Sequence, residues 1–167
     1  MKKKKLPLEP DFWADETISS PLLLLTAFFE QGNLNHYRTL LDDLLLHVYR
    51  PAVFCEKYPG QVFIIYLRLR SFVRACYRMQ ESPAPLPDRN LRGSRQRLLD
   101  EESQDPFLVF RRAFGEISLR EFDFFLKECI HLALCPYKDL PVTPFLPPYI
   151  HLDKMLEAAQ MIVEMNR

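Results

Sequence analysis

Three arginines follow one another at four-residue spacing in this sequence: Arg70, Arg74 and Arg78. On a helix, which turns by about 100° per residue, this spacing places all three side chains in one stripe. Tyr66 and Tyr77 lie along the edge of that stripe. Guanidinium groups bind phosphates, and aromatic rings stack on nucleic-acid bases. The five residues are therefore a candidate binding stripe.

The same stripe has two structural explanations, and the sequence leaves them open. The arginines could pair with acidic residues of another helix, such as Asp42 and Asp43, or form a solvated helix face. The chain has 22 basic and 22 acidic residues and no net charge. A nucleic-acid-binding domain usually has a basic excess, so this balance lowers that expectation without excluding a local basic patch. The basic stretches 2–5 and 89–97 could contribute to such a patch.

Residue patterns for catalysis or metal binding are missing. His131 and Cys135 are four residues apart and could supply two metal ligands, but no neighbouring pair completes a tetrahedral set. The four glycines are scattered, and neither a Gly-x-Ser-x-Gly nor a His-Glu-x-x-His motif occurs. We expect no metal and no cofactor, and an enzymatic function ranks behind two binding functions.

The composition indicates a cytoplasmic protein. The four cysteines have no Cys-x-x-Cys spacing, and most lie in apolar helical patterns, which is typical of free thiols in a reducing compartment. The lysine run 2–5 is not followed by the apolar stretch of a signal peptide. The apolar run 22–29 is much shorter than the roughly 20 residues that span a bilayer. We expect no membrane association.

Helix start and stop residues divide the first half into three helices. Ser20 and Pro21 begin a short helix that ends before Gly32, Asn33 caps a second helix that Pro51 ends, and a long third helix over 61–80 carries the stripe. Residues 81–99 are rich in proline and then in arginine, which is typical of a linker, with one helical turn expected at 95–99.

The second half repeats this order. Asp105 and Pro106 begin a helix, Ser118 and Glu121 form a capping-box pattern for the next, and a last helix is expected from about Tyr149 to residue 165. The apolar, proline-rich segment 143–149 that precedes it is expected to pack as an ordered connection rather than to serve as a free proline-rich ligand.

Proline positions indicate an internal repeat. Pro21 and Pro106 differ by 106 − 21 = 85 residues, and the pairs 51/136 and 59/144 have the same difference. The sequence predicts an all-α fold, with residues 1–167 forming a single compact domain. We expect a six-helix bundle of two pseudo-symmetric three-helix units, 15–80 and 100–165, joined by the linker 81–99. A short helical solenoid is the alternative.

Two functional hypotheses follow. The first is a non-catalytic helical interaction or scaffold module, with another protein or a second copy docking on an apolar groove between the units. The second is a nucleic-acid-associated regulator that uses Arg70, Arg74 and Arg78. The stripe has no counterpart in the second unit, where a shift of 85 gives Met155, Ala159 and Val163. It is therefore not part of the repeated scaffold.

Overall fold

The computed structural model describes residues 6–14, 18–54, 60–81, 97–135 and 140–167. These residues form helices and no strand, which confirms the all-α prediction. The helices are α1 (Pro21–Gln31), α2 (Leu34–Tyr49), α3 (Gly60–Met79), α4 (Asp100–Gln104), α5 (Pro106–Glu116), α6 (Leu119–Leu134) and α7 (Leu146–Met165). Of the linker 81–99, only residues 81 and 97–99 lie within the described ranges.

Polar caps fix the starts of α2 and α6 where the sequence predicts them, whereas Ser20 precedes α1 without a capping hydrogen bond from its side chain. The side chain of Asn33 accepts a hydrogen bond of 2.8 Å from the backbone N–H of His36. Ser118 and Glu121 bond reciprocally, at 2.7 Å and 3.3 Å, and so form the predicted capping box. Each cap satisfies an N–H group that has no partner inside its helix.

Two helix boundaries differ from the sequence prediction. Helix α7 begins at Leu146, 149 − 146 = 3 residues earlier than expected, with Pro147 and Pro148 in its first turn. Proline is tolerated there because the first N–H groups of a helix have no acceptor inside it. A short helix lies at 100–104, directly after the linker, and residues 97–99 of the turn expected at 95–99 are not helical, while residues 95 and 96 lie outside the described ranges.

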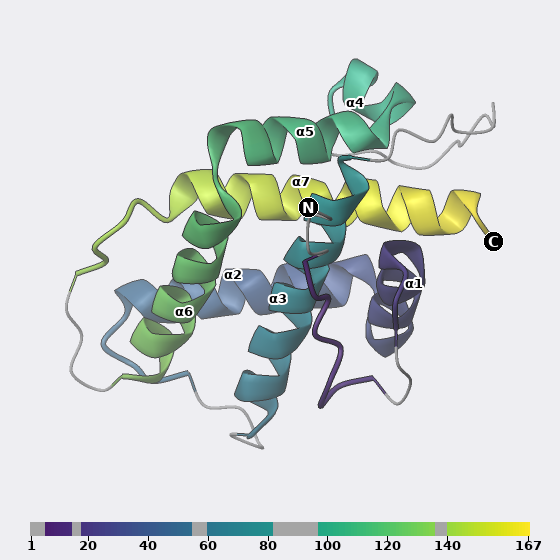
Figure 1. Ribbon diagram of the computed structural model, residues 1–167. Coiled ribbons are helices and arrows are strands. Elements are labelled where there is room, and N and C mark those ends of the chain that lie inside the picture. Colours follow the sequence, from purple (N-terminus) through teal and green to yellow (C-terminus); the bar gives the residue numbers. More distant parts are fainter. Residues whose placement is uncertain (1–5, 15–17, 55–59, 82–96, 136–139) are drawn as a thin grey trace, which may run out of the picture.

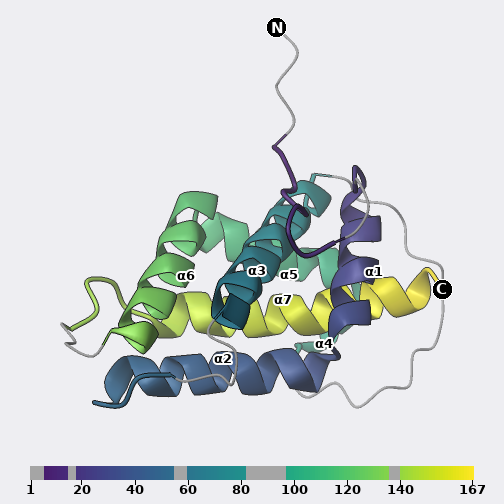
Figure 2. The ribbon, with the colours of Figure 1, turned by 90° about the horizontal axis from the view of Figure 1, so that it is seen from below.

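The helices run in two directions. Helices α1, α3 and α6 lie side by side, and α2, α5 and α7 run across them (Figure 1). Helix α7 occupies the centre, in contact with α1, α3 and α5, while α2 lies along its other side (Figure 2). Most residues of α7 are therefore buried.

An aromatic cluster joins the first three helices. The ring of Phe28 stacks on Tyr37 at 4.0 Å between centroids and lies 4.8 Å from Phe72. The hydroxyl of Tyr37 donates a hydrogen bond of 2.8 Å to the carbonyl oxygen of Phe28. Burial raises the pKa of Tyr37 to about 12, although the nearby Arg68 opposes the shift. The cluster thus contains no unsatisfied phenol.

Two acidic residues of α7 are buried and paired. Arg38 of α2 contacts Asp153 at 2.7 Å and Glu157 at 2.5 Å. Arg97, which precedes α4, contacts the second oxygen of Asp153 at 2.6 Å. Since an unpaired buried carboxylate is costly, these pairs fix α2 and the start of the second half against α7.

Glu102 anchors α4. The whole residue is 2% exposed to solvent. Its carboxylate accepts hydrogen bonds from the backbone N–H of Leu99 (2.9 Å), from Lys154 (3.0 Å) and from Arg112 (3.0 Å). Burial alone would raise the pKa of this carboxyl, but the three donors outweigh burial and lower the pKa below its usual value. The carboxylate therefore ties α4, α5 and α7 together in its ionised form.

Leucine truncation tests the packing of α1. Leu25 is fully buried, whereas Leu23 on the same helix is 60% exposed. Leu25→Ala removes buried methyl groups and leaves a cavity, so we expect the free energy of unfolding to fall by about 2–5 kcal/mol. The matched control Leu23→Ala should change it by less than about 0.5 kcal/mol. Urea unfolding of the three proteins measures both, and equal losses would contradict the placement of α1.

The Glu102 network predicts a pH dependence of stability. Because folding lowers the pKa of this carboxyl, its contribution is complete above the ordinary value of 4.5 and is lost as the pH falls through the folded-state value. We expect Glu102→Gln to destabilise the protein most at neutral pH, with the difference from wild type shrinking in acid. Glu101→Gln, at an exposed neighbouring position, is the control. A difference in unfolding free energy that stays constant with pH would refute this role.

Candidate functional site

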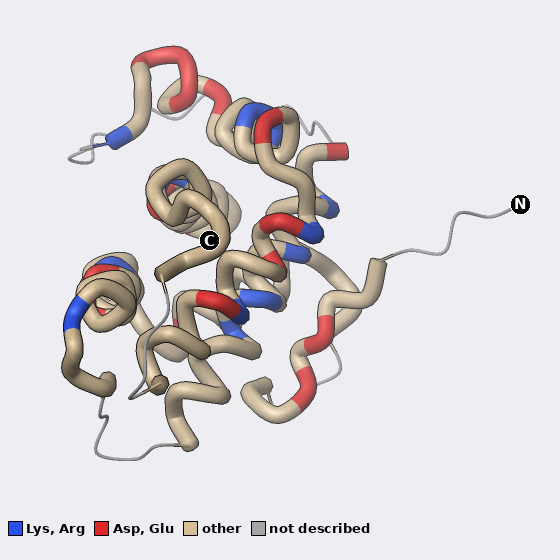
Figure 3. The backbone as a smooth tube through the Cα atoms, turned by 90° about the vertical axis from the view of Figure 1, so that its left-hand side faces the viewer, with Lys and Arg blue, Asp and Glu red and all other residues tan. Residues whose placement is uncertain are grey.

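Two arginines of the predicted stripe are held between two carboxylates. Glu9 contacts Arg70 at 2.7 Å through one oxygen and Arg74 at 2.9 Å through the other. On the other side, Asp123 of α6 lies 3.4 Å from Arg70 and 3.7 Å from Arg74. Two positive and two negative charges therefore form a neutral cluster. Figure 3 shows basic positions of α3 next to acidic positions of the neighbouring elements.

Glu9 belongs to an N-terminal segment, residues 6–14, that lies along α3. Its apolar side chains Leu8 and Trp13 are 4% and 7% exposed. The indole N–H of Trp13 donates to the Ser71 hydroxyl at 3.1 Å, and this hydroxyl donates to the carbonyl oxygen of Glu9 at 2.6 Å. The guanidinium of Arg74 also donates to the carbonyl oxygen of Pro7 at 3.1 Å. The segment thus covers the middle of the stripe with matched polar partners.

The remaining stripe residues lie in other surroundings. Arg78 donates to the carbonyl oxygen of Ser19 at 3.4 Å, and the ring of Tyr77 packs edge-on against Phe114 of α5 at 5.1 Å. Burial raises the pKa of Tyr66, which lies beside the charges of Arg70 and Asp123. The structure therefore brings Tyr66, Arg70 and Arg74 together around Glu9 and Asp123, while Arg78 and Tyr77 face α1 and α5.

The acidic partners differ from those considered in the sequence. Asp42 accepts a hydrogen bond of 2.5 Å from the hydroxyl of Tyr149 and takes no part in the described ion pairs of the stripe. Glu9 and Asp123 could not be singled out from the sequence because neither has a fixed spacing from the arginines. Their segments meet α3 only in the folded chain.

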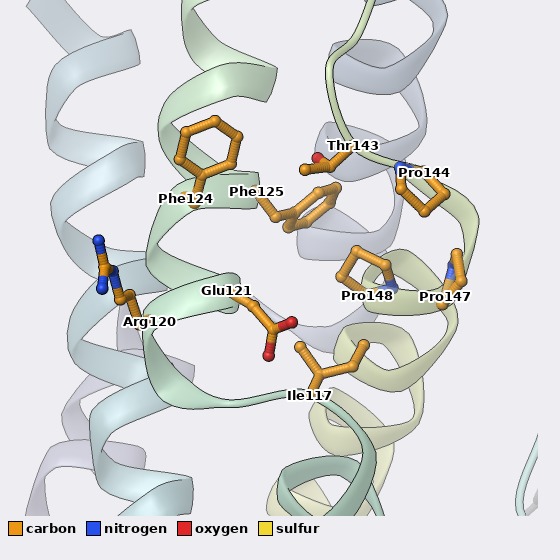
Figure 4. A pocket seen from close by; sticks show the side chains of 9 residues that line it. All are labelled: Ile117, Arg120, Glu121, Phe124, Phe125, Thr143, Pro144, Pro147 and Pro148. Atoms are coloured by element: carbon orange, nitrogen blue, oxygen red, sulfur yellow. The ribbon is translucent and has the colours of Figure 1, made fainter.

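A pocket of about 390 Å³ lies between α6 and the connection that enters α7. Figure 4 shows Phe125 and Glu121 extending from α6 toward the prolines of the connection, with Ile117 below them. The lining is mostly apolar and consists of Ile117, Arg120, Glu121, Phe124, Phe125, Thr143, Pro144, Pro147 and Pro148. Phe124 is 46% exposed. The pocket is therefore an open apolar surface of a size that holds one or two side chains.

Local sequence explains how the pocket is held open. The capping box fixes Glu121 at the start of α6, and hydrogen bonds from the Ser118 hydroxyl and N–H lower the pKa of the Glu121 carboxyl. Glu128 accepts hydrogen bonds from Val142 N–H at 2.6 Å and from the Thr143 hydroxyl at 2.7 Å. Proline rings then form the opposite wall, which cannot collapse easily because their backbone torsion is fixed.

The described residues contain no group of three or more potential ligands arranged for a metal ion. Cys76, Cys129 and Cys135 carry reduced thiols, and Cys55 lies outside the described ranges. Burial raises the pKa of the Cys129 thiol to about 12, so this group stays protonated near neutral pH. Within the described part of the chain, no helix combines the length and apolar character needed to cross a membrane.

Arg74 in the middle of the stripe and Arg78 at its end should differ in their contribution to stability. Arg74→Met leaves Glu9 and Asp123 without one of their shared cations, and because Arg74 is 7% exposed we expect a loss of about 2 kcal/mol or more. Arg78→Met makes the same change of residue type on the same helix and removes, among the contacts of the described residues, one long hydrogen bond, so we expect less than about 1 kcal/mol. Urea unfolding distinguishes the two, and equal small losses would show that the cluster is loosely held.

Comparison of the chain with known protein families, with curated proteins and with solved structures gives no match in any of the three. A shared fold or ancestor therefore supplies no function for this chain. The remaining basis is the chemistry of its own surfaces, because function depends on the site rather than on the fold class. Two such surfaces are the neutral arginine cluster and the apolar pocket.

Proposed function

We propose that this chain is a non-catalytic interaction module that docks a protein segment in the pocket between α6 and residues 143–148, which enter α7 and form its first turn. The observation that carries this proposal is the open apolar pocket itself, with Phe124 at its margin and Phe125 inside. An aromatic and proline-lined hollow loses unfavourable water contact when an apolar side chain fills it. We specify a protein partner because the pocket is open, mostly apolar and of a size that holds one or two side chains.

The pocket also indicates the charge of its partner. Glu121 extends toward the prolines, is exposed, and stays ionised because Ser118 stabilises its carboxylate. One of its oxygens is used in the capping box, which leaves acceptor capacity on the carboxylate. Arg120 points away from the prolines (Figure 4). We therefore specify the partner as a segment with an apolar anchor next to a lysine or arginine.

The arginine stripe gives less support to a nucleic-acid-associated role. Binding to phosphates draws on unneutralised basic groups. Arg70 and Arg74 instead lie in a neutral cluster with Glu9 and Asp123. Residues 2–5 lie outside the described ranges, as does most of the basic stretch 89–97. The contacts of the arginines therefore favour an interaction module over a nucleic-acid-binding protein.

We also propose that the six longer helices form a bundle of two three-helix units that arose by duplication, with the five-residue helix α4 as an addition that precedes α5. Three helices of 11, 16 and 20 residues occur twice in the same order, as α1, α2, α3 and as α5, α6, α7. The contacts have the same symmetry: α1 packs on α3 as α5 packs on α7, while α2 packs on α6. Such pairing supports a pseudo-twofold arrangement rather than a solenoid, in which each repeat contacts only its neighbours.

The register of this proposed repeat changes by one residue. The bounds of the first two helix pairs differ by 85, but Gly60 and Leu146 differ by 146 − 60 = 86. At a shift of 86, Leu69 corresponds to Met155 and Cys76 to Ile162, and all four are buried. One residue is therefore added in the connection before α7, and the counterparts of the arginines become Leu156, Gln160 and Glu164.

The pocket is specific to the second unit, which supports a role beyond the shared scaffold. At the shift of 85, Phe124 corresponds to Thr39, and Glu121 corresponds to His36. The first unit therefore lacks both the aromatic margin and the carboxylate. Features that only one copy carries are the ones expected to serve binding rather than folding.

Selection from a displayed peptide library tests the proposal. Peptides that bind the full chain should share an apolar anchor followed by lysine or arginine. Phe124→Ala should weaken a selected peptide by about tenfold or more, because the aromatic margin of the pocket is lost. Glu121→Gln should weaken it by a few-fold, since glutamine keeps the capping box but removes the charge. Fluorescence anisotropy of the labelled peptide measures both.

Phe63→Ala is the matched control, because Phe63 is 56% exposed and lies on α3. It should leave peptide affinity unchanged. Two outcomes would overturn the proposal: selection yields no peptide that binds better than its scrambled sequence, or the selected peptides bind Phe124→Ala and wild type equally.

A further inference from the structure

We infer that the face of α3 carrying Arg70, Ser71 and Arg74 is a peptide-binding surface, occupied in this structure by the chain's own residues 6–14, and that it accepts the same segment from a second copy. The two copies would exchange N-terminal segments reciprocally. None of the residues that this inference uses lines the pocket, and the inference does not depend on the pocket.

The charges of the cluster define what this surface binds. Asp123 neutralises one of the two arginines, so the face without its segment carries a single excess positive charge. Glu9 supplies one carboxylate and bridges Arg70 and Arg74 with its two oxygens. A single carboxylate therefore matches the surface, and a dianionic phosphate would meet repulsion from Asp123.

The neighbouring contacts add specificity. The Ser71 hydroxyl contacts the segment at two points. It donates a hydrogen bond to the carbonyl oxygen of Glu9 and accepts one from the indole N–H of Trp13. Leu8 and Trp13 bury their apolar side chains against the body of the protein. The surface thus recognises an apolar residue, then a carboxylate, then tryptophan four residues later, and residues 6–14 of another copy present this order.

The way the segment is held favours exchange. Residues 6–14 contain no helix and contribute to no sheet, so side chains and a few carbonyl groups provide their attachment. Within the described residues, the polar contacts of this segment with α3 all run to Arg70, Ser71 and Arg74, so the same segment of a second copy can make every one of them. Exchange of identical elements is a low-cost route to dimers.

A charge swap between two full-length variants tests the exchange. In Glu9→Lys, the lysine of the segment is repelled by the arginines of its own α3 face. In Arg70→Glu, the glutamate of the face is repelled by Glu9 of its own segment. When the two are mixed, the lysine introduced at position 9 of one copy meets the glutamate introduced at position 70 of the other, while the unchanged Glu9 meets the unchanged Arg70. We expect a heterodimer by sedimentation velocity in the mixture, at least about tenfold tighter than the self-association of either variant.

Trp13 provides a second readout because it is the only tryptophan in the chain. Its fluorescence should shift to longer wavelength in each variant alone, as the segment leaves its site, and return to the wild-type position on mixing. Glu9→Lys mixed with Arg78→Glu is the control, since Arg78 makes no described contact with Glu9. This pair should remain monomeric.

Labelled nonapeptides with the sequence of residues 6–14 keep the test decisive if a variant folds poorly. The peptide that carries the Glu9→Lys change should bind Arg70→Glu better than the unmodified peptide does. Two monomers in the charge-swap mixture, or equal binding of the two peptides, would overturn the inference. Phe124→Ala introduced into both chains should not affect the heterodimer, so the result is separable from the fate of the pocket.

Discussion

Burial of α7 on nearly all sides is the constraint on which the remaining structure depends. The backbone of a helix satisfies its own hydrogen bonds, but polar side chains inside the core need partners. Asp153 and Glu157 lie on this helix, and Arg38 reaches both of them from α2. Arg97 reaches Asp153 from the end of the linker, just before α4. The central helix therefore determines where α2 and the entry to α4 have to lie.

The same rule explains the arginines of α3. Arg74 is nearly as buried as the acids of α7, and it lies between Glu9 and Asp123, with the carbonyl of Pro7 as a further acceptor. A buried cation is stable only when paired, so the N-terminal segment is part of the folded domain. The stripe is consequently not an open basic surface, although its chemistry suits a carboxylate-bearing segment.

In the duplication that we propose, the two halves of the chain share a scaffold but differ at their surfaces. Equivalent helices carry buried apolar residues at equivalent positions, for example Leu41 and Leu126. The pocket occurs where the second half places Phe124 and Glu121, and the arginine cluster occurs where the first half places Arg70 and Arg74. In our proposals each half thus contributes one distinct binding surface to a common framework.

The helices and most of their starts can be predicted from the sequence, because capping residues, prolines and apolar periodicity act within a few residues of one another. Asn33 and Ser118 cap the starts of α2 and α6, as their positions in the sequence predict. The start of α7 was misplaced, since prolines that usually precede a helix are also accepted in its first turn. Only the tertiary structure decided that Arg74 pairs with Glu9 and Asp123, and that Phe125 faces Pro148 across a pocket. These contacts join residues far apart in sequence, and their partners depend on how the helices pack, which no local spacing encodes.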